Sequence, residues 1–79
     1  MFRNQEIRKA AIDSLLEFVR EQCSLAEDKV IYQPRLVDKY SFKSGISART
    51  LNEYFDVLLG AGLIKNVMVG RYWRIGLPE

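Results

Sequence analysis

The chain contains no histidine, one cysteine and two prolines among its 79 residues. Without histidine, and with Cys23 as the only thiol, the sequence offers no metal cluster of imidazoles and thiolates and no Ser-His or Cys-His catalytic pair. The acidic residues are spread along the expected helices with Lys or Arg nearby, as is typical of a solvated surface. We therefore expect no enzyme, with no catalytic residue, metal or cofactor and no small-molecule substrate.

Long apolar runs are also missing. No stretch approaches the roughly 18 apolar residues that cross a bilayer, and the first residues lack a charged-then-apolar secretory pattern. Gly60-Ala61-Gly62 precedes a strand-like run, whereas glycine-rich phosphate loops precede a helix. We expect a cytoplasmic protein without membrane contact and without a nucleotide loop.

The composition indicates one folded domain, because 48% of the residues are hydrophobic and glycine and proline are few. A chain of this length buries only about 60% of the surface that its unfolded form exposes, so its own core is marginal. Oligomerisation is a reasonable expectation.

Charge is distributed unevenly along the chain. Residues 1–29 carry a net charge of −1, whereas residues 30–78 carry +4. A positive surface attracts phosphates, so the second part of the chain is where nucleic-acid contacts are expected.

The hydrophobic periodicity predicts an α+β, mostly α, domain spanning residues 1–79. The expected elements are three helices and a small antiparallel sheet: helix 5–23 capped by Asn4, a short strand 30–32, helix 34–43, helix 47–60 and a C-terminal hairpin 63–77.

The first helix carries two apolar rows. Ile7, Ala11, Leu15 and Phe18 form one, and Ile12, Leu16, Val19 and Cys23 form the other. So wide a stripe predicts that the first row packs on the chain's own core and that the second is a homodimer interface. In the alternative interpretation the helix is central and both rows are internal. Cys23 is then either a core residue or part of an intersubunit disulfide.

The segment 44–64 contains the most informative pattern. Gly45 suits a sharp turn between two helices, and Ser47 suits the N-cap of the second helix. An apolar stripe then faces the core, consisting of Leu51, Phe55, Leu58 and Leu59. The opposite face is polar and carries Arg49, Asn52, Glu53 and Asp56.

Three spacings around the glycine carry a resemblance to a known family. Ser41 lies four residues before Gly45, Ile46 follows it, and Leu51 lies six residues after it. The pattern resembles the helix-turn-helix of DNA-binding proteins, and the Gly-Leu-Ile that leads into a hairpin resembles its winged-helix branch. The resemblance covers residues 30–77.

The resemblance implies sequence-specific binding of double-stranded DNA by a small homodimeric transcriptional regulator at the nucleoid. Helix 47–60 would enter the major groove, with base contacts from Ser47, Ala48, Arg49, Asn52 and Glu53. The hairpin would be the wing. The small size is reminiscent of regulators from archaea and their viruses or plasmids.

Contacts to the DNA backbone are expected from basic side chains and one hydroxyl, namely Arg35, Lys39, Lys43, Thr50, Lys65, Arg71 and Arg74. Arg35, Lys39 and Lys43 recur at four-residue spacing and form one row, which alternatively is only a solvated face. Tyr72 and Trp73 point to opposite faces of the hairpin, so one of them should close the core.

Two alternatives to sequence-specific binding remain. A winged-helix protein-interaction module would expose an apolar patch around Phe42, Val69 and Tyr72. An architectural or replication-associated DNA-binding protein would bind without much sequence preference.

Overall fold

The structure is a computed structural model that describes residues 2–78, with the side chains of residues 8–78. In chain order it contains α1 (Phe2–Leu25), β1 (Val30–Ile31), α2 (Gln33–Ser44), α3 (Ala48–Gly60), β2 (Lys65–Val69) and β3 (Tyr72–Gly76). These three helices and the three-stranded antiparallel sheet confirm the predicted α+β fold with a winged-helix layout. The first helix begins before Asn4, so the prediction that Asn4 caps it is wrong.

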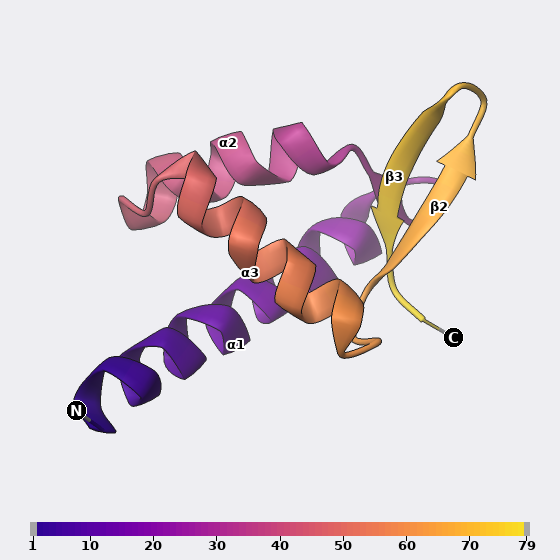
Figure 1. The fold of residues 1–79 in the computed structure, drawn as a ribbon. Helices are drawn as coiled ribbons and strands as arrows, with labels where there is room; N and C mark the ends of the chain where they lie inside the picture. Colours follow the sequence, from indigo (N-terminus) through magenta and orange to yellow (C-terminus); the bar gives the residue numbers. More distant parts are fainter. Residues whose placement is uncertain (1, 79) are drawn as a thin grey trace.

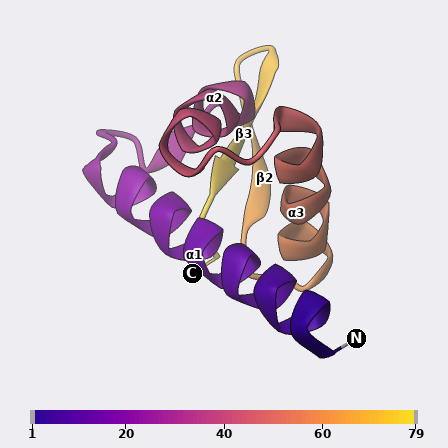
Figure 2. The same ribbon diagram turned by 90° about the vertical axis from the view of Figure 1, so that its left-hand side faces the viewer.

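The helices form two layers around a common core. Long α1 lies on one side, and α2 and α3 lie across it, while the hairpin stands at the end of the molecule where α2 begins (Figures 1 and 2). Among the described residues, no helix combines the length and the hydropathy that crossing a bilayer requires.

The core draws on every helix and on the sheet. Its side chains are Leu15, Leu16, Phe18, Val19 and Cys23 of α1, Leu36, Val37 and Tyr40 of α2, Leu51, Phe55 and Leu58 of α3, and Ile64 and Ile75. Each large apolar side chain buried in this way stabilises the fold by roughly 1.5–3 kcal/mol. Within residues 8–78 no polar or charged residue is buried.

Among the described side chains, Leu15 and Phe18 of the first row belong to this core, and so does the second row, as the alternative interpretation expected. Val19 and Cys23 are 0% exposed and Leu16 is 7% exposed, while half-buried Ile12 packs against the core. Leu16, Val19 and Cys23 are therefore not available to the predicted homodimer interface, because the chain's own core covers them. For half-buried Ile12 an interface role stays a prediction. Cys23 is a free thiol in the chain's own core, which is the first of the two roles considered for it. Ile7 lies outside the residues whose side chains are described.

The sheet has the order β1-β3-β2, with β3 in the middle. Val30 pairs with Gly76 and Ile31 with Ile75, so β1 covers only the last two residues of β3. The outer part of the hairpin therefore extends beyond the body of the molecule.

Tyr72 and Trp73 lie in this extended part and are 59% and 57% exposed. The prediction that one of them closes the core is wrong. Ile75 takes that place, because it lies on the same face as Trp73 but two residues nearer the body, where β1 and the helices cover it.

Candidate nucleic-acid interface

The turn between α2 and α3 is held by local hydrogen bonds. Gly45 has φ 78°, in the left-handed region, and its N–H donates to the carbonyl oxygen of Ser41 at 2.8 Å. The Ser44 hydroxyl donates to the Tyr40 carbonyl oxygen at 2.6 Å and accepts from the N–H of Ile46 at 3.2 Å. The predicted role of Gly45 is confirmed, and the start of α3 is fixed relative to α2.

Ser47 is the N-cap of α3, as predicted. Its hydroxyl oxygen accepts from the N–H of Thr50 at 3.3 Å, and its O–H donates to Thr50 Oγ1 at 3.0 Å. Both hydroxyls are therefore engaged in the cap. Thr50, predicted to contact the DNA backbone, is half-buried.

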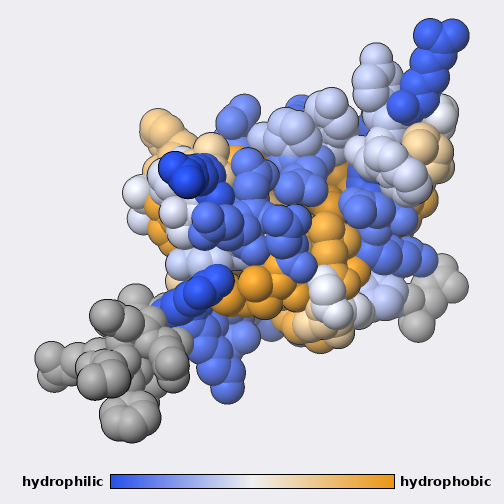
Figure 3. Space-filling view, viewed as in Figure 1, coloured by the Kyte–Doolittle hydropathy of each residue, from blue (hydrophilic) through white to orange (hydrophobic). Residues whose placement is uncertain are grey.

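The polar face of α3 is open to solvent. All five predicted base-reading residues are exposed, namely Ser47, Ala48, Arg49, Asn52 and Glu53. The opposite face, with Leu51, Phe55 and Leu58, is buried. Figure 3 shows a mostly hydrophilic surface over the outward side of α3.

Among the predicted base readers, Asn52 forms a hydrogen bond to another helix, whereas the bonds of Ser47 stay within α3. Asn52 Oδ1 accepts from Nε2 of Gln33, in the first turn of α2, at 3.1 Å. This bond orients the Asn52 amide at the outer surface. A two-bond contact with adenine uses both amide atoms, so Asn52 Oδ1 would have to share or exchange this bond.

A groove separates α3 from the hairpin. It is lined by Asn52 of α3, by Gln33 and Pro34 of α2, by Asn66, Arg71, Tyr72 and Trp73 of the hairpin, and by Tyr32. Gln33 and Asn66 are amide-bearing residues that the sequence did not single out. Neither sits in a recognisable motif, and only the folded arrangement brings them to Asn52.

The charge of this surface comes mainly from the hairpin. On α3, Arg49 is the one basic residue, followed on the exposed side by Glu53 and Asp56. On the hairpin, exposed Arg71 lines the groove and adds positive charge, whereas exposed Lys65 lies on the same face of the hairpin as Arg74. In Figure 3, strongly hydrophilic atoms project from its tip, where Gly70 and Arg71 form the turn. A phosphate backbone would thus meet positive charge at the start of α3 and at the tip of the hairpin.

The basic row on α2 lies elsewhere. Lys39 Nζ is 3.5 Å from Gln22 Oε1 on α1, and Lys43 Nζ lies 5.5 Å from the centre of the Phe18 ring, also on α1. Gln33, on the other flank of α2, contacts α3. The structure therefore does not bring Lys39 and Lys43 to α3.

Arg74 and Arg35 also lie away from the groove that faces α3. Arg74 alternates with Trp73 along β3, so it lies on the other face of the hairpin, half-buried and 6.0 Å from the centre of the Tyr32 ring. Together with Arg35, Tyr32 and Tyr72 it lines a second hollow, which shares Tyr32 and Tyr72 with the groove. Of the predicted backbone contacts on the hairpin, Arg71 lines the groove that faces α3, whereas Lys65 shares the other face of the hairpin with Arg74.

Comparison of the chain with family models, curated proteins and solved structures gave no match. Within the described residues, no group of three or more His, Cys, Asp and Glu side chains is placed to hold a metal ion. A functional assignment thus rests on the fold and on the surface formed by α3 and the hairpin.

Proposed function

We propose that this protein binds double-stranded DNA, with the N-terminal half of α3 in the major groove and the β2–β3 hairpin against the backbone. The observation that carries the proposal is the exposed face of α3, where Arg49 and Asn52 lie one helical turn apart beside a groove bordered by Arg71 and Trp73. A helix of this width fits the major groove, and its N-terminal end favours phosphate.

Within this proposal the side chains have distinct roles. Arg49 suits a two-bond contact with guanine, Asn52 suits adenine, and Glu53 suits the amino group of cytosine. Arg71 binds a phosphate and carries no sequence information. The main role of Ser47 is to fix the start of α3 as its N-cap. Its contribution to phosphate binding is secondary, because its hydroxyl already forms two hydrogen bonds with Thr50.

The role as a small transcriptional regulator at the nucleoid is part of the proposal. A homodimer on a two-fold symmetric site is also compatible with it. The interface would then be formed by residues other than Leu16, Val19 and Cys23, which the chain buries itself.

The test separates base reading from phosphate binding. Preferred duplexes are selected from a random pool, and Arg49→Ala and Arg71→Ala are titrated against them by gel shift at two salt concentrations. We expect Arg49→Ala to lose about 1–3 kcal/mol and to relax the preference at one base pair. Arg71→Ala should weaken binding to every sequence and lower the salt slope by about one unit.

Lys9→Ala is the control, because Lys9 is exposed on α1, on an element that does not border the groove. If both arginine variants lose affinity without any change in sequence preference, the protein is a non-specific DNA-binding protein. If the wild type binds no duplex at either salt concentration, the proposal is wrong.

A specific observation favours one second candidate, a protein-interaction module. The hairpin exposes Met68, Val69, Tyr72 and Trp73, which are 39–59% exposed and form two cross-strand pairs. The patch that such a module was expected to show does not include Phe42, which is 96% exposed but lies near the opposite end of α2 from the hairpin. Binding of a partner protein that added DNA does not displace would favour this candidate.

A further inference from the structure

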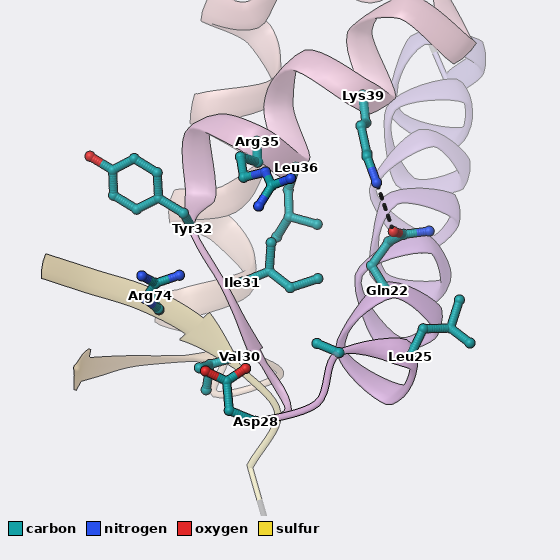
Figure 4. A pocket seen from close by; sticks show the side chains of 11 residues that line it. Gln22, Leu25, Asp28, Val30, Ile31, Tyr32, Arg35, Leu36, Lys39 and Arg74 are labelled. Atoms are coloured by element: carbon teal, nitrogen blue, oxygen red, sulfur yellow. Dashed lines mark hydrogen bonds between the residues drawn. The ribbon is translucent and has the colours of Figure 1, made fainter.

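The face of the hairpin turned away from α3 carries a cluster of arginines and tyrosines. Tyr32, Arg35, Tyr72 and Arg74 line a hollow of ≈ 380 Å³, which we call the Tyr–Arg hollow. The residues come from three places in the chain: the junction of β1 and α2, the first turn of α2, and β3. Figure 4 shows Tyr32, Arg35 and Arg74 around this junction.

The two tyrosine rings in the hollow form a small aromatic platform. The rings of Tyr32 and Tyr72 meet edge to face, with centres 6.0 Å apart and planes at 76°. Both remain accessible, at 37% and 59% exposure. Exposed aromatic rings of this kind are what nucleic-acid bases stack on, whatever their sequence.

Among residues 8–78, neither guanidinium group in the hollow forms an ion pair with a carboxylate. Arg20 and Glu17 form the one ion pair found among residues 8–78, so neither Arg35 nor Arg74 is neutralised there. Arg74 is held in place under the Tyr32 ring, with its Nε buried and without a hydrogen-bond partner. Two unneutralised guanidiniums beside open rings fit a ligand that combines phosphates with planar bases.

A second hollow continues the positive surface along α2. It has a volume of ≈ 310 Å³, shares Tyr32, Arg35 and Arg74 with the first, and extends to Lys39, Gln22 and Asp28. Arg35 and Lys39 are one helical turn apart, about 6 Å along the axis. Lys43 does not extend this positive surface. It lies in another hollow, where the acidic residues Glu17 and Glu21 offset its charge.

We infer that the Tyr–Arg hollow binds an unpaired stretch of nucleic acid, with a base against Tyr32 and Tyr72 and the adjoining phosphates on Arg35 and Lys39. Charge complementarity selects this occupant, since three cations meet one carboxylate, Asp28, along the two hollows. The inference goes beyond duplex binding, because Arg35 and Arg74 lie outside the groove that faces α3.

The experiment measures fluorescence anisotropy with a labelled oligodeoxythymidine, an oligouridine of the same length and a blunt DNA duplex. Arg35→Ala and Tyr72→Ala should each weaken binding of the single strand at least about fivefold. Tyr72→Phe should bind the single strand as well as the wild type does, because it keeps the stacking ring. Lys39→Ala should lower the salt slope for the single strand by about 0.7.

Two control variants match the changes. Phe42→Ala removes an aromatic ring that is 96% exposed near the far end of α2, and Arg20→Ala removes an arginine on α1. Both should leave single-strand binding unchanged. Circular dichroism of each variant checks that the helices are retained, so that a loss of binding is not a loss of fold.

The duplex arm separates the two proposals through Arg35 and Arg49, because Tyr32 and Tyr72 line both the hollow and the groove that faces α3. Arg35→Ala should keep duplex binding, and Arg49→Ala should keep single-strand binding. If the wild type binds single strands and not duplexes, the inference holds and the proposed duplex binding fails. A preference for one oligomer identifies DNA or RNA as the source of the strand.

Two results would overturn the inference. One is the absence of single-strand binding by the wild type. The other is a loss of single-strand binding in Arg35→Ala without any loss in Tyr72→Ala, whose affinity would then equal that of the control Phe42→Ala. In that case the hollow would attract any polyanion and no base would stack on Tyr72.

Discussion

Cys23 is a completely buried thiol near the C-terminal end of α1, next to the last residues of β3. Its Sγ lies 3.7 Å from the Ile75 carbonyl oxygen, to which the thiol donates a weak hydrogen bond. Burial raises the pKa of the Cys23 thiol, because the charged thiolate is poorly solvated inside the core. The thiol is therefore a packing residue and a poor nucleophile.

This burial has a consequence for stability against pH. The folded thiol keeps its proton at pH values where the unfolded thiol has lost it, so the free energy of unfolding should fall as pH rises above the ordinary thiol pKa. Cys23→Ala should remove this part of the alkaline decline in urea-denaturation experiments. Iodoacetamide should also alkylate the folded protein far more slowly than the urea-unfolded chain. Equal alkylation rates in the two states would contradict the burial of Cys23.

Single residues were predictable where their role is local. Gly45 and Ser47 act within a few residues of themselves, so the turn and the cap could be identified from the sequence. The bond between Gln33 and Asn52 joins residues 19 positions apart and depends on how α2 meets α3. No local pattern indicates it.

At the scale of elements, α2 shows what periodicity determines and what it leaves open. The four-residue spacing of Arg35, Lys39 and Lys43 correctly predicts one row on the helix. Which neighbour the row faces depends on the tertiary packing of α2. Lys39 and Lys43 lie toward α1, and the flank that carries Gln33 lies toward α3.

The N-cap of α3 gives a prediction for this element. Ser47→Ala should lower the free energy of unfolding by about 0.5–2 kcal/mol, because the Thr50 N–H loses its side-chain acceptor. Ser14→Ala, at an exposed position within α1, should cost nothing, since alanine favours a helix interior. Urea denaturation of the two variants measures the difference. Equal stabilities would mean that the cap does not hold the start of α3.

At the scale of the whole molecule, the sequence predicted the elements and their order but not how far each surface is covered. The second row of α1 was expected to face a partner chain, yet the crossing of α2 and α3 over α1 covers it. Tyr72 or Trp73 was expected to close the core, yet the two-residue β1 covers only the inner end of β3. Both outcomes depend on distances between helices and strands in the folded chain, and the hydrophobic periodicity of the sequence does not determine these distances.

The central claim is that the outward face of α3 and the hairpin together bind duplex DNA. The most direct measurement is the affinity of the wild-type protein for a random-sequence duplex between about 50 and 200 mM salt. On a random-sequence duplex Arg49 has no fixed base partner and contacts a phosphate, as Arg71 does, so log K should fall against log salt with a slope of about −2. An affinity that does not change with salt, or no binding at the lowest salt concentration, would contradict the account.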